Sequence, residues 1–517
     1  MQLLTNVLSV AVMFSGLASF ALGATPITVL DDRDWRGPAA AARAEGIERE
    51  MTAELLLKAE LKEPVFLFDP TDDETITTIT DFRGKLYLGS CTRPTLTATG
   101  SVFIYEPETN RWHEAFRVND EGLVRLEVYG DRLYIAGPDA NDGGWEFGNI
   151  YVHDGQTWVE HRTVPRAIHL HGLAVYGDRI YVSGAVLDPP PAGYSIDDAY
   201  EKGLINCYGR VLSSGDGGLT WREEYRSPLP RPGIGPLTTF GDKLVLNAYG
   251  DLLTFDGKRW RPLGLSPNAL VVFDWTAAGD TLLIASSLGL CFLRGEALSR
   301  PFYVPFFEPA RAVVRFGDSW VVLQSYTQGG LPLLGAEATH YPNLNEDPDR
   351  LRSVIRVFPE SLLDEIVTES LFGAALSEQV ASVRFREMAV SAHAFKGRLY
   401  LGTHPEGRVL VLPVVKEGML DSAPRAVSAA GTYSLFWEAA TPTGTSCRLQ
   451  IRTAPTREAL EKQPFVGPDA NQASYFDAPG TAVRIAQPGF VQYRVLLKTE
   501  NPALTPYLKR VTLRPGA

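Results

Sequence analysis

The stretch Ser214-Gly215-Asp216-Gly217-Gly218-Leu219-Thr220-Trp221 reads Ser-x-Asp-x-Gly-x-Thr-Trp and predicts a tight hairpin turn. In such a turn the Asp216 carboxylate accepts hydrogen bonds from nearby backbone N–H groups, and the glycines adopt positive φ angles. Trp221 then packs against the sheet that carries the turn. The pattern therefore predicts two antiparallel strands, one on each side of residues 214–221.

A second pattern repeats along the chain and predicts the fold. Each copy has an aromatic or small residue, a turn containing glycine, and an apolar triplet, which together are typical of a β-hairpin. The seven copies are 82–88, 129–135, 176–182, 240–246, 278–284, 316–322 and 395–401. A second hairpin follows at Gly100–Trp112, Gly148–Trp158, Gly209–Trp221 and Gly250–Trp260. Two hairpins make a four-stranded blade, so we predict an all-β chain with a seven-bladed β-propeller at residues 64–418.

Two segments resemble known propeller motifs. Residues 214–221 resemble the Asp-box, or BNR repeat, of sialidase-type β-propellers, and residues 105–112 resemble the end of a kelch blade. The resemblance implies a fold and not an activity. Sialidases grip a carboxylate with an arginine triad and begin with a Phe/Tyr-Arg-Ile-Pro motif, and this sequence does not contain that motif. We therefore do not expect sialidase activity.

The N-terminal residues predict export. Residues 1–23 resemble a secretory signal peptide, because they are apolar, carry no charge and end in small residues. The predicted location is secreted, periplasmic or cell-surface, and a membrane contact is expected only if this segment stays uncleaved. Residues 24–63 are predicted to be an N-terminal helical segment, with a short helix at Ala39–Lys62. The strand Val65–Asp69 is expected to close the ring as the outer edge of the last blade.

The C-terminal residues predict a second domain. Residues 419–431 contain Ala, Ser and Pro and are predicted to be a linker. Residues 432–517 alternate apolar and polar side chains in short runs, which predicts a small β-sandwich. Phrases such as Val491-Gln492-Tyr493-Arg494-Val495 resemble accessory sandwich domains of secreted bacterial proteins.

Charge and motifs exclude several classes of partner. The net charge of −12 argues against nucleic acid, which would require a basic face. The four cysteines lie far apart without a C-x-x-C spacing, so buried thiols are expected. The sequence has no P-loop, Gly-x-Ser-x-Gly or His-Glu-x-x-His motif. No cofactor and no metal site are predicted, and the question whether the fold binds a structural Ca²⁺ is left open.

Candidate site residues gather where the third blade opens. His169 and His171 are two residues apart on one strand and therefore face the same side. With the loop residue Tyr194 and the strand residues Tyr208 and Arg210, they are the candidates for catalysis. The candidates for ligand binding are Arg93, Asp139, Trp145, Arg311, His340 and His404.

These residues fit two functions. In the first, the propeller binds a glycan or another extracellular partner, such as a protein. In the second, it is a lyase that cleaves a uronate polysaccharide by β-elimination, as in propeller lyases that act on ulvan-like polymers. His169 or His171 would be the base, Tyr194 or Tyr208 the acid, and Arg210 would neutralise the uronate carboxylate. Whether the chain is an enzyme is left open.

Overall fold

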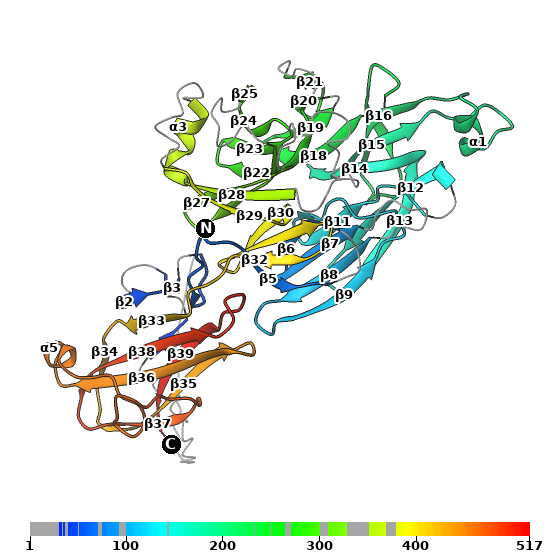
Figure 1. Ribbon diagram of the computed structural model, residues 1–517. Helices are drawn as coiled ribbons and strands as arrows, with labels where there is room; N and C mark the ends of the chain where they lie inside the picture. The colour runs from blue at the N-terminus through cyan, green and yellow to red at the C-terminus, as the bar shows by residue number, and fades with distance from the viewer. Residues whose placement is uncertain are drawn as a thin grey trace, which may run out of the picture.

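The computed structural model describes residues 30–33, 35–36, 40–49, 51–70, 75–91, 100–141, 144–231, 233–248, 250–263, 270–299, 309–327, 351–368 and 379–516. The predicted signal peptide at 1–23 lies outside these residues. The described chain is all-β with a few short helices, as predicted, and Figure 1 shows a group of blade-like sheets and a separate C-terminal lobe. Within the described residues no helix combines the length and apolar character needed to cross a membrane.

Six four-stranded antiparallel sheets of the described chain are each built from four consecutive strands. The first three sheets contain β6 (Thr75–Phe82), β7 (Lys85–Cys91), β8 (Ser101–Glu106) and β9 (Arg111–Arg117); β10 (Glu127–Tyr129), β11 (Arg132–Ala136), β12 (Phe147–His153) and β13 (Trp158–Pro165); and β14 (Ala167–Tyr176), β15 (Arg179–Leu187), β16 (Cys207–Ser214) and β17 (Arg222–Arg226). The next three contain β18 (Ile234–Phe240), β19 (Lys243–Ala248), β20 (Asp251–Phe255) and β21 (Trp260–Pro262); β22 (Val272–Ala278), β23 (Thr281–Ser286), β24 (Gly289–Arg294) and β25 (Ala297–Ser299); and β26 (Ala310–Phe316), β27 (Ser319–Thr327), β28 (Leu351–Pro359) and β29 (Ala381–Phe385).

A further four-stranded sheet joins the two ends of this series. It contains β30 (Met388–Phe395), β31 (Arg398–His404) and β32 (Val409–Val411), and its outer strand is β5 (Val65–Phe68) from the start of the series. Phe66 is the register partner of Leu410, so the predicted closing strand is confirmed. The first strand of each sheet lies beside the first strand of the next, and β30 lies beside β6. The sheets therefore form the closed ring of a β-propeller.

The turn at 214–221 has the predicted hydrogen bonds. Asp216 Oδ1 accepts from the backbone N–H groups of Leu219 and Thr220 at 3.1 and 2.9 Å. Gly217 and Gly218 have φ angles of 79° and 98°, which a side chain would strain. Trp221 Nε1 donates to Thr163 Oγ1 of the preceding sheet at 3.1 Å, so the turn also ties two blades together.

The core of the ring consists of apolar side chains packed between neighbouring sheets. Tyr87 and Val102 of the first sheet pack with Leu133 and Tyr151 of the second in one buried cluster. All four cysteines are buried as thiols, as expected. Among the described residues, three helical segments lie in connections of the ring: η1 (Gly144–Glu146), α1 (Ile196–Glu201), and η4 (Glu360–Leu362) continued by α3 (Leu363–Thr368).

The predicted N-terminal helix is wrong, because the segment forms strands. β2 (Ala41–Glu45) pairs with the sandwich, and β3 (Ile47–Glu48) pairs with β4 (Leu56–Leu57). Its Ala, Glu and Leu content favours a helix locally. The edge of a distant sheet offers backbone hydrogen bonds instead, and this tertiary context outweighs the local preference.

The predicted linker at 419–431 is also wrong. β33 (Glu417–Ser422) and β34 (Arg425–Val427) both pair with β38 (Gly489–Thr499), which also pairs with β36 (Thr445–Ala454). With β2 they form a five-stranded sheet. Leu420 and Val427 are buried in the sandwich core, a packing role that the Ala, Ser and Pro content of the segment does not reveal.

The second sheet of the sandwich has the order β1-β39-β35-β37. Its strands are β1 (Leu30–Asp32), β39 (Tyr507–Pro515), β35 (Gly431–Ala440) and β37 (Thr481–Ile485), and the sandwich also carries α5 (Arg457–Glu461). The residues before the propeller and the residues after it thus build one sandwich. Lys509 of β39 and Lys396 of the propeller form ion pairs with the same carboxylate, that of Glu108, which connects the two domains.

Candidate functional site

The ring axis holds a small cavity of about 70 Å³. Four of the first strands line it, through residues of β6, β22, β26 and β30. Arg125 reaches across this space: its Nε bonds to Glu127 at 2.8 Å, and its Nη1 donates to the carbonyl of Phe273 at 2.7 Å. Its Nη2 lies 3.3 Å from Asp274 Oδ1. Arg125 therefore joins the second blade to the fifth through the centre of the ring.

The channel charges are held inside the fold. Burial raises the pKa of both Glu127 and Asp274, and the Arg125 guanidinium opposes this effect in each case. Asp274 Oδ2 also accepts the backbone N–H of Val313 at 3.2 Å. Arg125, Glu127 and Asp274 could not be recognised as a group from the sequence, because no local motif shows that residues this far apart meet.

A second group of polar side chains lies at the open end of the third blade. His169 Nδ1 donates to the Pro138 carbonyl at 2.6 Å, which fixes the proton on that nitrogen because a carbonyl can only accept. Asp139 Oδ2 lies 4.0 Å from the same nitrogen, and Asp139 Oδ1 accepts from Trp145 Nε1 at 3.2 Å. The structure thus brings together three predicted residues: Asp139, Trp145 and His169.

The pKa values at this end are shifted by burial. Burial raises the pKa of Asp139 to about 6, with His169 acting in the opposite direction. Burial lowers the pKa of His171 to about 4, and His169, whose ring centroid is 6.0 Å away, lowers it further. His171 is therefore a neutral imidazole at pH 7, and Asp139 is largely a carboxylate at pH 7.

Exposed aromatic rings border this end of the blade. Ser195 caps α1 by accepting from the Asp198 backbone N–H at 3.1 Å, and α1 carries Tyr200. Tyr194 is 44% exposed and Tyr200 is 38% exposed, and the Tyr200 ring packs edge-on against Trp145 with a centroid distance of 5.6 Å. Figure 1 shows α1 at the outer end of β15 and β16, away from the sandwich.

Arg210 is placed differently from the other candidates. It is 4% exposed, and its terminal nitrogens bond to Asp188 at 2.5 Å and to Glu223 at 2.6 Å. Both carboxylates belong to the third blade. The Tyr208 ring has the Arg226 guanidinium 3.7 Å from its centroid. Arg210 and Tyr208 therefore both contact other residues of the blade, and Arg210 already donates to two carboxylates.

The remaining candidates do not join this group. Arg311 is buried at the channel with its guanidinium 4.3 Å from the Phe273 ring centroid. His404 is buried in β31, where its Nδ1 lies 2.6 Å from Thr75 Oγ1. Arg93 and His340 lie outside the described residues.

Sequence reasoning missed a buried carboxyl close to the third-blade group. Asp120 is fully buried, and its Oδ2 accepts from Tyr151 Oη and from Asn149 Nδ2. Its Oδ1 has no hydrogen-bond partner among the described residues. Burial raises the pKa of Asp120 to about 7, so the group titrates near neutrality. Nothing in its local sequence distinguishes Asp120 from an ordinary loop aspartate.

The part of the chain that the structure describes contains no group of three or more His, Cys, Asp or Glu side chains arranged to hold a metal ion. The third-blade group therefore offers hydrogen bonding, aromatic contacts and one neutral imidazole. These suit the recognition of a polar ligand or a proton transfer.

Comparisons with known proteins establish no family. No family model matches the chain, and no curated protein matches it. Among solved structures, the chain is similar to the computationally designed Ika8 protein (11% identity, 69% of this chain, 100% of that chain, TM-score 0.39). It is also similar to the WD40 domain of Neurospora crassa Pan2 (10% identity, 70% of this chain, 96% of that chain, TM-score 0.39).

A third similar structure is the extracellular domain of a protein from B. thetaiotaomicron described as a hybrid two-component system. The identity is 10% and the TM-score 0.42, over 72% of this chain and 43% of that chain. The chain thus covers less than half of that domain. At these identities and TM-scores the similarities establish no shared function. By its own structure, the chain is a β-propeller protein with a β-sandwich made from both ends of the described chain.

Proposed function

We propose that this protein binds an extracellular glycan through the third-blade face, defined as Asp139, Trp145, His169, Tyr194 and Tyr200. The observation that supports the proposal is the exposure of Tyr200, whose ring packs on Trp145, while Trp145 donates to the Asp139 carboxylate. Tyr194 is also exposed and lies directly before the N-cap of α1, the helix that carries Tyr200. Aromatic faces pack against the apolar faces of sugar rings, and carboxylates accept hydrogen bonds from hydroxyls. A protein partner is the other possible occupant of this face.

The proposed location is outside the cytoplasm. It rests on the apolar, uncharged residues 1–23, which resemble a signal peptide. The net charge of −12 supports a partner that is not a nucleic acid. Neither a cofactor nor a structural Ca²⁺ is part of the proposal.

The test is binding of the full chain to a panel of immobilised polysaccharides. Trp145→Ala and Tyr200→Ala should each weaken retention about tenfold or more, because each removes an aromatic contact. Phe66→Ala is the matched control, since Phe66 is 56% exposed on β5, in a different blade. Equal retention of all three variants and the wild type would contradict glycan binding at this face.

A uronate lyase is the second candidate, favoured by His171. Its lowered pKa of about 4 supports a neutral imidazole at pH 7, as a base requires. The ion pairs of Arg210 with Asp188 and Glu223 weigh against the predicted role of Arg210 in neutralising a substrate carboxylate. Incubation with uronate polysaccharides, followed by absorbance of unsaturated ends, decides the matter. Product formation that is lost in His171→Gln supports the lyase, and no product across the panel rejects it.

A further inference from the structure

The β-sandwich carries a depression of about 390 Å³ on the outer side of its five-stranded sheet. In the register of this sheet Gln450 of β36 lies opposite Arg494 of β38, and Arg452 lies opposite Gln492. The alternate residues Leu449, Ile451 and Tyr493 point into the buried core, so these polar side chains share the outer face. The depression is lined by Gln450, Arg452, Phe465, Gln472, Tyr475 and Arg494.

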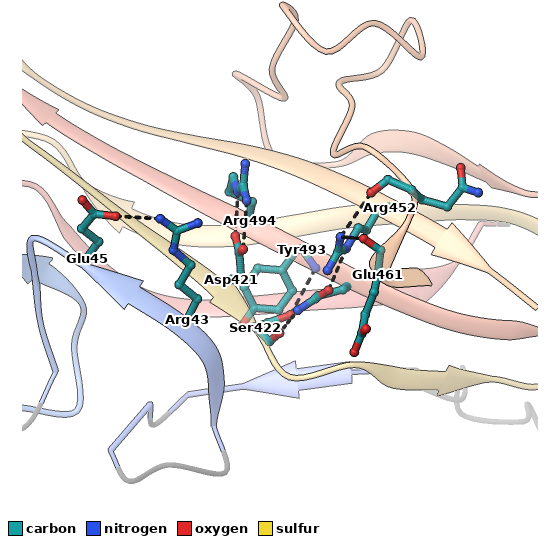
Figure 2. Close-up of polar contacts among 10 residues, drawn as sticks. Arg43, Glu45, Asp421, Ser422, Arg452, Glu461, Tyr493 and Arg494 are labelled. Atoms are coloured by element: carbon teal, nitrogen blue, oxygen red, sulfur yellow. Dashed lines mark hydrogen bonds and ion pairs between the residues drawn. The ribbon is translucent and has the colours of Figure 1, made fainter. Parts of the chain in front are cut away.

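Two arginines of this depression are held in different ways. Arg494 forms two parallel bonds to Asp421, at 2.6 and 2.9 Å, so a carboxylate balances its charge (Figure 2). Arg452 bonds only to neutral acceptors: Gln492 Oε1 at 2.8 Å and the backbone carbonyls of Glu461 and Gln463 at 3.3 and 3.2 Å. Within the described residues, no carboxylate lies at ion-pair distance from Arg452.

The Arg452 guanidinium is fixed in place without an anion. It packs on the Phe465 ring at 4.4 Å from the centroid, and Arg494 lies 4.1 Å from the same centroid. Its bonds use Nε and Nη1, which leaves the donors of Nη2 for a ligand. Burial lowers its pKa, which agrees with a charge taken partly out of water. A guanidinium held rigidly in this way can donate from Nη2 to a carboxylate oxygen in a charge-assisted hydrogen bond.

The neighbouring side chains indicate the rest of the ligand. Gln472 contributes an exposed amide group, which both donates and accepts hydrogen bonds and so suits a hydroxyl. Gln450 is buried beneath it, and its Nε2 donates to the carbonyls of Gln472 and Ser474 at 2.7 and 2.9 Å. Tyr475 is half-buried at the edge of the depression and offers an aromatic face. One carboxylate, several hydroxyls and an apolar ring face occur together in a sugar acid.

We propose that the sandwich depression binds a uronate residue of an acidic polysaccharide, with Arg452 as the residue that binds its carboxylate. This site is separate from the third-blade face and does not depend on it. The sandwich would then hold the propeller on a uronate-containing polymer. Because Asp421 already occupies Arg494, the contact is expected to use one arginine and to weaken only modestly with added salt.

The test is calorimetric titration of the full chain with a short oligogalacturonate and, separately, with a neutral galacto-oligosaccharide of equal length. The wild type should bind the oligogalacturonate more tightly. Arg452→Gln should weaken that binding about tenfold or more. Arg484→Gln removes the same charge from an exposed position on β37 and should leave it unchanged. Tyr475→Ala, which leaves the arginines in place, should also weaken it and serves if Arg452→Gln does not fold.

The proposal is overturned by equal binding of the two oligosaccharides, by unchanged affinity in both Arg452→Gln and Tyr475→Ala, or by no binding of the oligogalacturonate by the wild type. Trp145→Ala separates this site from the third-blade face. If Trp145→Ala abolishes oligogalacturonate binding while Arg452→Gln does not, the uronate binds at the propeller. The sandwich proposal then fails and glycan binding by the propeller stands.

Discussion

The central channel and the third-blade face of the same ring both contain charged and polar groups. The two regions differ in the surroundings of these groups. In the channel, Arg125 contacts Glu127, Asp274 and a carbonyl across the axis, and the cavity beside it is only about 70 Å³. At the third-blade face, Asp139 and His169 stand 4.0 Å apart beside exposed rings. Charges that the fold itself satisfies hold blades together, whereas charges beside exposed aromatic groups can be satisfied by a ligand.

Removal of the channel cation is expected to have the largest effect on the stability of the ring. Arg125→Met should lower the free energy of unfolding by about 3–5 kcal/mol, because Glu127 and Asp274 are left buried without their partner. Urea unfolding measures this loss. Arg117→Met is the control, since Arg117 pairs with Glu114 on the exposed outer strand β9 and should change stability little.

The pH dependence of the Arg125→Met variant shows whether its loss of stability comes from uncompensated carboxylate charge. A carboxyl whose pKa is higher in the folded than in the unfolded chain binds its proton more tightly when folded, so a lower pH stabilises the folded state. The loss in free energy of unfolding caused by Arg125→Met should therefore be smaller at pH 5 than at pH 8. A defect that stays constant over this range would show that the lost stability is packing and not uncompensated charge.

Asp120 is buried like the channel carboxylates, but no cation is bonded to it in the described chain. Its pKa of about 7 lies above the usual value of 3.8, so its contribution to stability is lost as pH rises from about 4 to about 7. Asp120→Asn removes this titration. Relative to the wild type, the free energy of unfolding of the variant should rise by up to roughly 4 kcal/mol between pH 4 and pH 8. Urea unfolding at each pH measures this difference. Parallel stability curves for the two proteins would contradict this.

Features that form between adjacent residues could be predicted from the sequence, whereas contacts between distant residues could not. Turns that contain glycine form from adjacent residues, so the hairpins at 82–88 and 395–401 and the turn at Asp216 are visible in the local sequence. Strand β2 is not, because it pairs with β33 far along the chain. Asp139, Trp145 and His169 meet because Asp139 and Trp145 lie between β11 and β12 of the second blade and His169 lies in β14, the first strand of the next blade. The contact between Arg125 and Asp274 depends on the closed ring and leaves no local pattern.

At the third-blade face we expect a smaller effect of pH, on the affinity for the glycan. If the Asp139 carboxylate accepts a hydrogen bond from a glycan hydroxyl, affinity should rise several-fold from pH 5 to pH 7, as a group with a pKa of about 6 loses its proton. Asp139→Asn should flatten this profile while thermal unfolding still reports a folded protein. A profile that keeps its slope in Asp139→Asn would assign the titration to another group and remove Asp139 from the binding face.

The turn at 214–221 gives the smallest expected effect, and it separates the two ends of the third blade. Asp216→Ala removes the acceptor for the Leu219 and Thr220 N–H groups, which become hydrated because the turn is exposed, so the unfolding midpoint should fall only slightly. Hydrogen bonds from Thr220 lower the pKa of Asp216. The wild type should therefore lose its advantage as pH falls below the usual range of an aspartate. Affinity for glycan should not change, since the turn lies at the other end of β16 from the third-blade face. Glycan affinity that falls together with the midpoint would mean that the two ends are coupled, and that the turn does more than hold the blade.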